Sequence, residues 1–470
     1  MPTNMKELPV SVGPEHWRFL QKGKFSDLQN DSSNCSMDDS LDTDADPAMS
    51  DPCCDRENPV VVEGQRICDA QDQIRGGVIR TPCTKTRMSE ALGSEVYFKK
   101  EFMQFTGSFK DRGALLALMN LTEEQKKRGV VTTSAGNHAQ AMAFQGGKLG
   151  IPVTVVMPKT APLVKVSSCR DLKAEVVLYG SRFDEAKAHA MKLRNERNLI
   201  YIDGYDHPDI LAGQGTVGLE ILEDVPDVDY VIVPVGGGGL VAGVSAAIKH
   251  VNPHVQIIGV ESERCPSWHT AMENGQPIKC QQTIKGAKQS ISDGLNVIRV
   301  GYNAFATAKI DRMVTVSEKY IAVAILRLLE GEKSVVEGAG AIGYAALLSG
   351  VLPEVKGKKV ACILCGGNID ATVLGLVIDR ALVQEGRMSR FMVVVSDRPG
   401  GLARLVAILA HMGASVKEIG HDRISLASYV YMTGITCTVE TKNKAHAQEV
   451  RQRLEETYGE DLRWQQESDE

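Results

Sequence analysis

The sequence predicts an α/β protein with two separate folded regions. Between residues 58 and 388, short apolar strands alternate with helices, which is the pattern of a parallel, doubly wound sheet covered by helices on both faces. From residue 389 to 470 the predicted elements follow the order βαββαβ, which is typical of a ferredoxin-like domain. These two patterns define the predicted fold class.

The N-terminal 57 residues differ from both regions, because they contain few aliphatic residues and many Ser and Asp. Such a segment buries too little apolar surface to offset the entropy lost on ordering. We therefore predict an acidic disordered tail over residues 1–57, in which the pair Cys53-Cys54 is incidental.

The strands of the large region are short runs rich in valine and isoleucine. They are predicted at Val130–Thr133, Val153–Val156, Glu175–Leu178, Leu199–Ile202, Tyr230–Val235, Gln256–Val260 and Lys359–Leu364. Polar or glycine-rich segments follow three of them, at residues 134–138, 236–239 and 365–368. Because ligands of doubly wound sheets bind beyond the carboxyl ends of the strands, these segments predict one shared site.

Helices are predicted between these strands and in the C-terminal region. Those of the large region cover residues 139–146, 184–197 and 240–251. The C-terminal module is predicted as strands Phe391–Val395, Ser415–Ile419, Tyr429–Val439 and Leu462–Gln465, with helices Gly401–His411 and Ala445–Thr457.

Composition excludes several classes of function. The formal net charge of −6 provides no basic footprint for nucleic acid. The longest nearly uncharged apolar run, Gly338–Leu352, is shorter than the ~18 residues of a membrane-spanning helix. Eleven cysteines occur without a repeated zinc spacing, and no hydrophobic signal segment is present at the N-terminus. We expect reduced thiols and a cytoplasmic protein.

Lys110 lies at the centre of the segment Phe105–Gly113, directly before a helix-compatible apolar run. Ser108 and Asp111 fit a loose capping box at the start of that helix. Amide dipoles at a helix N-terminus disfavour an ammonium, so the pKa of Lys110 should be lowered. A neutral amine of this kind can form a Schiff base, although a simply solvated lysine remains the alternative at this point.

The four glycines Gly236–Gly239 follow a strand and precede a helix, so their amides can surround an anion. The pattern Gly237-x-Gly239-x-x-Ala242, with Glu261 at the end of the next strand, also satisfies a relaxed dinucleotide fingerprint. An NAD-dependent Rossmann oxidoreductase is therefore one alternative, although that fingerprint normally opens the first βαβ unit. A tight turn that binds no ligand is another alternative for this glycine segment.

Two further strand ends carry polar groups. Ser134-Ala135-Gly136-Asn137-His138 offers amides at a helix start and the side-chain amide of Asn137, which suit a carboxylate or a phenolate-like oxygen. Ser134 could equally be a plain N-cap, and His138 a packed histidine. Cys365 could present a thiol to a cofactor or serve as a small hydrophobic residue.

In combination, these motifs resemble the fold-type II (tryptophan synthase β-like) pyridoxal-phosphate enzymes. The similarity is strongest to the threonine dehydratase (threonine ammonia-lyase) family, with serine racemases as relatives, and covers about residues 60–470. It is carried by Thr106–Gly113, Ser134–Gln140, Gly236–Gly243 and Cys365–Asn368, and the segment Asp397–Leu402 resembles an ACT regulatory domain. The resemblance thus implies a catalytic domain over 58–388 and an ACT-like domain over 389–470.

The resemblance implies roles for individual residues. Lys110 would hold pyridoxal phosphate covalently beside Phe109, Asn137 would bind its phenolic oxygen, and Cys365 would face its pyridine nitrogen. The phosphate would be bound by the amides of Gly236, Gly237, Gly238, Gly239 and Leu240. The substrate carboxylate would be bound by Ser134, Ala135, Gly136, Asn137 and His138. Since a thiol cannot keep the pyridine nitrogen protonated, β-elimination is favoured over transamination.

Two departures from the relatives affect the predicted reaction. Serine racemases carry a second serine where this chain has Ala135, which has no proton to exchange, so dehydration is favoured over racemisation. The racemase-type cation site would include Glu261 and the carbonyl of Cys265, but Ser267 replaces its remaining carboxylate. That loss leaves the binding of an activating Mg²⁺ or Ca²⁺ open, with Glu261 still available as a ligand.

The predicted function is conversion of L-threonine to 2-oxobutanoate and ammonia, with L-serine to pyruvate as a secondary reaction. A serine racemase-type enzyme, an NAD-dependent oxidoreductase and a non-catalytic amino-acid sensor are the alternatives. The turn Asp397–Leu402 suits an amino-acid effector, and pairing of such domains between subunits is the alternative role of the ACT-like domain. We expect a homodimer or homotetramer.

Overall fold

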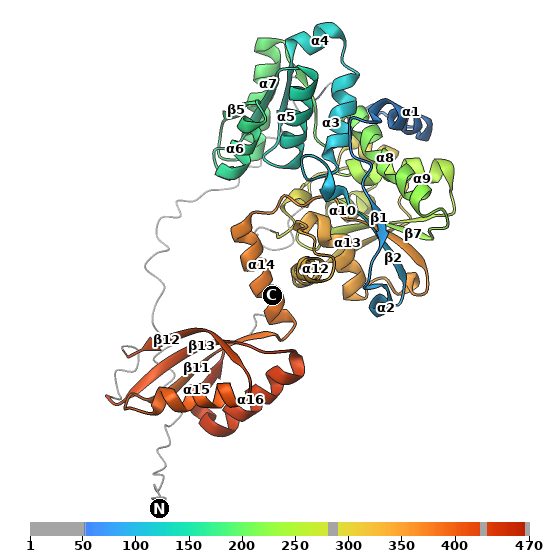
Figure 1. The fold of residues 1–470 in the computed structure, drawn as a ribbon. Coiled ribbons are helices and arrows are strands. Elements are labelled where there is room, and N and C mark those ends of the chain that lie inside the picture. The colour runs from blue at the N-terminus through green and yellow to red at the C-terminus, as the bar shows by residue number, and fades with distance from the viewer. Residues whose placement is uncertain (1–50, 52, 281–289, 424–429, 466–470) are drawn as a thin grey trace, which may run out of the picture. The chain divides into compact units, whose positions relative to one another are not determined.

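The computed structural model describes residues 51, 53–280, 290–423 and 430–465, which form two compact units (Figure 1). The larger unit ends at Ile378 and the smaller one begins at Asp379, so the division falls within helix α14 (Ala371–Gln384). The sequence prediction placed this division ten residues later, after residue 388. None of the helices described is both long enough and apolar enough to cross a membrane.

Most of the predicted N-terminal tail lies outside the described residues, but its last part contacts the larger unit. Asp51 is only 4% exposed, and Asn303 donates a hydrogen bond of 2.7 Å to the carbonyl of Cys53. Asn303 also accepts a bond of 2.7 Å from the amide of Val60. Contacts with the larger unit therefore begin before residue 57, where the predicted tail was expected to end.

The larger unit contains a six-stranded sheet with the order β1-β2-β10-β7-β8-β9. Its strands are β1 (Cys83–Lys85), β2 (Glu95–Lys99), β7 (Tyr230–Pro234), β8 (Gln256–Ser262), β9 (Arg312–Val316) and β10 (Lys359–Ile363). Only β1 runs antiparallel to its neighbour. The central strands are buried almost throughout, as expected for a parallel sheet covered on both faces.

A second parallel sheet has the order β5-β4-β3-β6. Its strands are β3 (Val130–Thr133), β4 (Val153–Met157), β5 (Glu175–Leu178) and β6 (Ile200–Tyr201). The prediction of one doubly wound sheet was therefore wrong. These four consecutive strands pair only with one another, because their connecting helices α5 (Asn137–Leu149), α6 (Leu163–Asp171) and α7 (Phe183–Arg197) complete a local α/β layer.

The remaining helices of the larger unit include three that position the candidate site, namely α3 (Lys110–Met119), α8 (Pro208–Asp224) and α9 (Gly239–Val251). The others are α1 (Gly64–Ile74), α2 (Ser89–Leu92), α4 (Glu123–Arg128), α10 (Ser267–Asn274), α11 (Tyr302–Thr307), α12 (Glu318–Gly331) and α13 (Gly338–Ser349). Short 3₁₀ turns occur at Glu101–Met103, Asp293–Leu295, Pro353–Val355 and Gly459–Asp461.

Helix α8 is buried from Pro208 to Ile221 and packs against both α3 and α9 (Figure 1). The approach is close, since a Cβ on Gly213 would lie 2.6 Å from the Cα of Gly113. On the other side, a Cβ on Gly243 would lie 2.6 Å from the amide nitrogen of Gly215. The two helices whose first residues are Lys110 and Gly239 are thus fixed against one central helix.

The smaller unit is an antiparallel sheet with the order β12-β13-β11-β14 and two helices. Its elements are β11 (Met388–Ser396), α15 (Gly401–His411), β12 (Ser415–Asp422), β13 (Met432–Glu440), α16 (Lys444–Tyr458) and β14 (Leu462–Trp464). This βαββαβ order and strand arrangement confirm the predicted ferredoxin-like fold. Tyr429, the predicted start of the third strand, lies outside the described residues.

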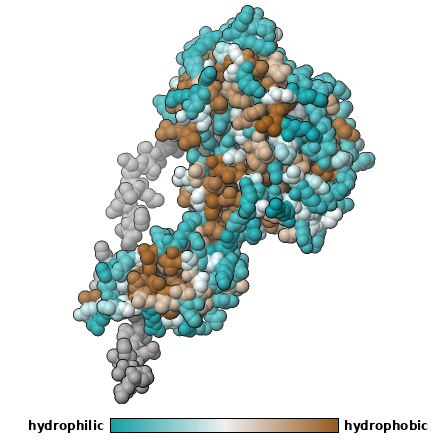
Figure 2. Space-filling view, in the orientation of Figure 1, coloured by the Kyte–Doolittle hydropathy of each residue, from teal (hydrophilic) through white to brown (hydrophobic). Residues whose placement is uncertain are grey.

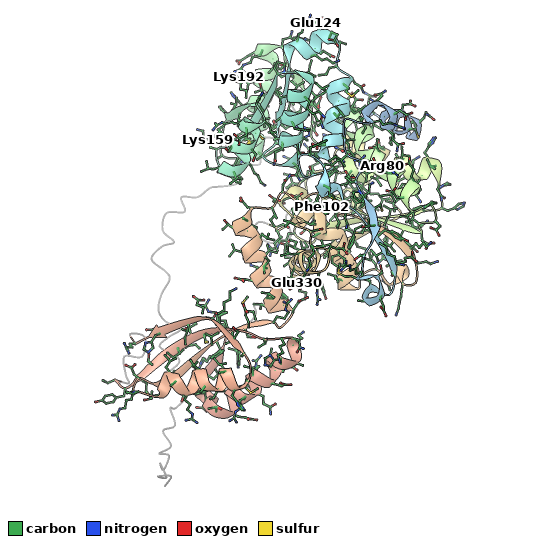
Figure 3. All side chains as sticks on the ribbon, viewed as in Figure 1. Arg80, Phe102, Glu124, Lys159, Lys192 and Glu330 are labelled. Carbon is green, nitrogen blue, oxygen red and sulfur yellow. The ribbon has the colours of Figure 1, made fainter. Side chains whose placement is uncertain are left out.

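Charged side chains cover the outer surface of the larger unit. Glu124, Lys159 and Lys192, labelled in Figure 3, are all exposed. Arg80, also labelled there, pairs at the surface with Glu223 and Asp224 at the end of α8.

Candidate active site

Lys110 is the first residue of α3, as predicted, and its Nζ donates a hydrogen bond to the carbonyl of Gly204. The Nζ lies 5.1 Å from the centre of the Phe109 ring. Burial lowers the pKa of Lys110 from 10.5 to about 8, and the nearby Asp203 and Cys365 raise it. The predicted direction of this pKa shift is confirmed, but burial rather than the helix dipole is its main cause.

The predicted capping box at this helix start is wrong. Phe109 is the N-cap and no side chain caps α3. Instead, the buried carboxylate of Asp111 accepts hydrogen bonds from the hydroxyl of Thr106 and, at 3.0 Å, from its amide. The Ser108 hydroxyl is fully buried and has no protein partner, so a polar atom of a bound ligand could satisfy it.

Asn137 is the first residue of α5, which begins two residues before the predicted start. Its Oδ1 accepts a hydrogen bond of 2.8 Å from Asn368, and its Nδ2 donates one of 2.6 Å to Glu337. Glu337 is 4% exposed, and burial raises the pKa of its carboxyl group to about 7. Glu337 was not predicted as a site residue, and Asn368 was predicted only as part of the motif Cys365–Asn368.

The loop before α5 presents backbone rather than side-chain donors. Ser134 accepts a bond of 3.2 Å from the amide of Gly136, so it closes a turn instead of capping the helix. Ala135 packs as a partly buried apolar residue. His138 is 3% exposed, and its Nε2 lies 3.4 Å from the carbonyl of Ile202.

Burial and, to a smaller extent, the charge of Lys110 lower the pKa of His138 to about 3. The imidazole is therefore neutral at physiological pH and contributes no charge to the site. A Cβ on Gly204 would lie 3.1 Å from the His138 ring, so this ring packs under the backbone whose carbonyl accepts from Lys110.

The glycine segment after β7 leaves no room for side chains. A Cβ on Gly237 would lie 2.3 Å from the ring of Tyr205, and one on Gly239 would lie 2.5 Å from the Tyr205 carbonyl. Gly238 has a φ of +99°, and a Cβ added to it would lie 2.4 Å from the ring of Trp268. No side chain caps α9, whose first-turn amides lack intrahelical acceptors and can bind an anion.

Cys365 follows β10 and is 2% exposed. Its carbonyl accepts a bond of 3.1 Å from the amide of Phe109, and the next residue, Gly366, forms a bridge with Ser108. Burial raises the pKa of the Cys365 thiol well above its usual value, so the thiol is neutral. The structure therefore joins the end of β10 directly to the segment that carries Lys110.

Glu261 lies apart from these groups, and its carboxylate already has protein partners. It accepts 2.6 Å bonds from the amide of Trp268 and from Nδ1 of His269. The carbonyl of Cys265 accepts a bond of 2.9 Å from the amide of Ser267. Over the described residues, no group of three or more metal-binding side chains occurs. These contacts do not favour the predicted cation site.

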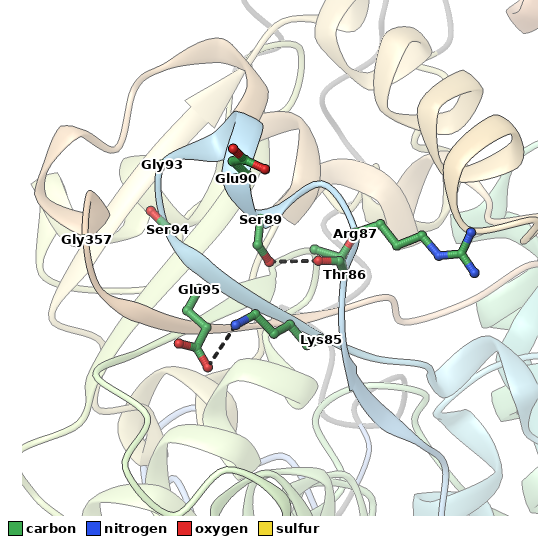
Figure 4. A pocket seen from close by; sticks show the side chains of 9 residues that line it. All are labelled: Lys85, Thr86, Arg87, Ser89, Glu90, Gly93, Ser94, Glu95 and Gly357. Atoms are coloured by element: carbon green, nitrogen blue, oxygen red, sulfur yellow. Dashed lines mark hydrogen bonds and ion pairs between the residues drawn. The ribbon is translucent and has the colours of Figure 1, made fainter.

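A surface depression of about 500 Å³ lies elsewhere on the larger unit (Figure 4). It is lined by Lys85, Thr86, Arg87, Ser89, Glu90, Gly93, Ser94, Glu95 and Gly357. Lys85 and Glu95 form an ion pair of 3.4 Å across it. None of the candidate site residues lines this depression.

The residues around Lys110 fit pyridoxal phosphate. A buried amine with a lowered pKa can bond to the carbonyl carbon of an aldehyde. The glycine segment packs so closely against Tyr205 and Trp268 that it carries no side chains, and it leads into the uncapped amides of α9, which suit a phosphate. The unpartnered hydroxyl of Ser108 adds a buried polar atom.

Comparison with known proteins agrees with this fit. The chain is 43% identical over 387 residues to the L-threonine ammonia-lyase of Thermotoga maritima, an alignment that covers 82% of this chain and 95% of the relative. It is 42% identical over 316 residues to the catabolic L-threonine dehydratase of Escherichia coli K12, covering 66% and 94%.

Solved structures with a similar fold include a threonine deaminase and a serine racemase. Threonine deaminase isoform 2 of Solanum lycopersicum superposes with a TM-score of 0.64 at 34% identity, covering 69% of this chain and 96% of that one. The serine racemase of Dictyostelium discoideum superposes with a TM-score of 0.61 at 31% identity, covering 66% and 100%. Residues 74–366 match the family described as "Pyridoxal-phosphate dependent enzyme". The chain belongs to this family of pyridoxal-phosphate-dependent enzymes.

Proposed function

We propose that this protein is an L-threonine ammonia-lyase that forms 2-oxobutanoate and ammonia, and that it converts L-serine to pyruvate as a secondary reaction. The observation that carries the proposal is the partly buried Lys110 amine, whose pKa is lowered to about 8, at the start of helix α3. The relatives named L-threonine ammonia-lyase and L-threonine dehydratase support the choice of substrate.

Pyridoxal phosphate, when bound, supplies the electron sink for α-proton removal. In the proposal, Lys110 anchors the cofactor beside Phe109, Asn137 donates to its phenolic oxygen and Cys365 faces its pyridine nitrogen. The amides of residues 236–240 bind its phosphate. Each of these groups lies at a strand end or a helix start of the larger unit.

The chain's own residues then account for binding and proton transfer. The amides of residues 134–138 bind the substrate carboxylate, since α5 begins at Asn137 without a side-chain cap and its first amides lack intrahelical acceptors. The neutral Nζ of Lys110 accepts the α-proton of the amino acid. Burial lowers the pKa of this amine to about 8, so a much larger fraction is neutral near physiological pH than for an exposed lysine.

A serine racemase-type activity is the second candidate, because a serine racemase is among the similar structures. Ala135 argues against it, since its methyl group cannot return a proton to the face opposite Lys110. Turnover on L-threonine, L-serine and D-serine, with the products identified, tests both activities. Release of 2-oxobutanoate from L-threonine supports the proposal, whereas formation of D-serine from L-serine without oxoacid would contradict it.

Membership in the pyridoxal-phosphate family argues against the NAD-dependent alternative. It also argues against a sensor without catalysis, although the smaller unit can still carry regulation. We propose that this unit is an ACT-like domain that binds an amino-acid effector near Asp397, whose carboxylate accepts bonds of 3.0 and 2.9 Å from Arg423. Ammonia release measured with single amino acids added, for wild type and Asp397→Ala, tests this assignment.

We further propose a cytoplasmic homodimer or homotetramer. Figure 2 shows apolar side chains at the surface of the smaller unit. Its exposed apolar residues include Leu402, Val406, Val416 and Ile419. Such residues are suited to pairing between subunits. Light scattering on the purified protein gives the oligomeric state, and a monomer would contradict this part of the proposal.

Replacing Gly238 by alanine is expected to raise the dissociation constant for pyridoxal phosphate on the order of tenfold or more. Alanine disfavours the left-handed backbone by about 1–2 kcal/mol, and its Cβ would press on Trp268 at 2.4 Å. Fluorescence titration of the apoprotein with the cofactor measures this constant. Gly275→Ala is the control, because Gly275 also has a positive φ (+66°) but nothing within 4 Å. Equal constants for the two variants would contradict the phosphate role.

Capture of pyridoxal phosphate by the apoprotein is expected to accelerate with pH and to level off above about pH 8. Only the neutral amine attacks the aldehyde, and the pKa of Lys110 is lowered to about 8. As pH falls below that value, the amine becomes protonated and the rate falls. Stopped-flow absorbance from pH 6 to 10 measures the profile, with N-acetyl-lysine as the control. A protein rate that keeps rising to pH 10, as for the free amine, would contradict the lowered pKa.

A further inference from the structure

A chain of side-chain amides links the Lys110 segment to Glu337 inside the larger unit. The Nδ2 of Asn368 donates to the carbonyl of Thr106 at 2.7 Å and to Oδ1 of Asn137 at 2.8 Å. The Nδ2 of Asn137 donates to Oε1 of Glu337 at 2.6 Å. These residues come from four separate segments, and sequence separations of 200 and 231 residues divide Asn137 from Glu337 and Asn368.

The donor and acceptor types along this series of hydrogen bonds define the orientation of each side-chain amide. A backbone carbonyl can only accept, so the atom of Asn368 that faces Thr106 must be its nitrogen. Both hydrogens of that nitrogen are then used, which means that Asn137 must face Asn368 with its oxygen. The nitrogen of Asn137 consequently faces Glu337, which accepts one of its two hydrogens.

The position of Glu337 is fixed by contacts with the segment that follows β10. Its amide donates a bond of 3.1 Å to the carbonyl of Gly366, and its side chain lies over that glycine, where a Cβ would come within 2.2 Å of Oε1. The same Cβ would lie 3.1 Å from Nδ2 of Asn137. Only a glycine at this position, next to Cys365, permits the contact between Glu337 and Asn137.

We propose that Glu337 is a positioning residue: by accepting one hydrogen of the Asn137 amide, it directs the second N–H of Asn137 to the phenolic oxygen of pyridoxal phosphate. The proposal rests on the cofactor role proposed for Asn137. It assigns to Glu337 no contact with the substrate and no proton transfer.

The test compares Glu337→Ala with Glu337→Gln in the full-length protein reconstituted with pyridoxal phosphate. Glu337→Ala is expected to raise the dissociation constant for the cofactor about tenfold and to shift the pH at which the absorption of the lysine-bound cofactor changes, because Asn137 loses its orientation. Glu337→Gln is expected to stay within about threefold of wild type, since its amide oxygen can accept the same hydrogen without a charge.

Two further variants separate positioning from general stability. Glu318→Gln alters another carboxylate that accepts hydrogen bonds, from Ser290 and from the amide of Ile291, and should leave cofactor affinity unchanged. Asn368→Ala removes the orienting contact from the opposite side and should weaken cofactor binding in the same direction as Glu337→Ala. If Glu337→Ala does not fold, the cofactor affinity of Asn368→Ala tests the proposal.

Wild-type affinity and an unchanged absorption profile in Glu337→Ala would overturn the proposal. Equal losses in Glu337→Gln and Glu337→Ala would also overturn it, because a charge and not an acceptor would then be needed. Failure of the proposed function is a distinct result. A protein that binds the cofactor but releases no ammonia from L-threonine would refute the proposed activity. The cofactor affinities of the variants would still decide the role of Glu337.

Discussion

Replacing Lys110 by alanine is expected to remove both the visible absorption of the lysine-bound cofactor and ammonia release from L-threonine. The substitution deletes the amine that we propose to bond the cofactor and to accept the α-proton. Loss of such a base typically lowers kcat by 10²–10⁴-fold, and loss of the covalent bond adds to this, so we expect a decrease of about 10³-fold or more. Absorbance spectra and an ammonia assay measure the two effects.

Lys148→Ala is the matched control for this variant. Lys148 is also a lysine beside aromatic rings, with its Nζ 5.3 Å from the centre of the Phe105 ring, but it is exposed. It should keep the spectrum and the activity of wild type. If Lys110→Ala retained the absorption and full ammonia release, the assignment of Lys110 would be wrong.

Local sequence patterns were sufficient to predict the segments that form the candidate site. Lys110 does begin a helix, and the segment Gly236–Gly239 does connect a strand to a helix. Both predictions depend on short-range features, namely apolar runs and glycines at strand ends. The ferredoxin-like unit was predicted for the same reason, since each of its elements has its own hydrophobic pattern.

Features that depend on distant parts of the chain were not predicted. Ser108 and Asp111 have the spacing of a capping box, but the Asp111 carboxylate accepts from the amide and hydroxyl of Thr106 instead, and the Ser108 hydroxyl is buried without a partner among the described residues. Glu337 carries no local signal beyond its place before a glycine-rich helix, and its partner Asn137 lies 200 residues away. The division into two sheets likewise depends on strand pairing that hydrophobic pattern alone does not define.

Arg112, two residues after Lys110, belongs to a buried ionic network that the sequence did not reveal. Its guanidinium donates bonds of 2.8 Å to both carboxylate oxygens of Glu101, and bonds of 2.7 and 2.8 Å to those of Glu220. Lys99 donates a further bond of 2.6 Å to Glu220. All four side chains are at most 6% exposed, so each charge depends on the others for compensation.

Arg112→Ala is therefore expected to lower the free energy of unfolding by about 3–5 kcal/mol, because Glu101 would lose its guanidinium partner inside the protein. Thermal and urea unfolding followed by circular dichroism measure the change. Arg80→Ala is the control: Arg80 also pairs with two carboxylates, of Glu223 and Asp224, but it is 54% exposed, and we expect a loss below about 1 kcal/mol.

Measurements on Arg112→Ala and Arg80→Ala also test how the fold positions the amine of Lys110. The network joins α3 to α8 through Glu220 and to the 3₁₀ turn Glu101–Met103 through Glu101. If it positions Lys110, Arg112→Ala should also weaken cofactor capture at temperatures where the variant is still folded. Similar stability losses for Arg112→Ala and Arg80→Ala would show instead that the buried charges are replaceable, and that packing of α3 against α8 alone holds Lys110 in place.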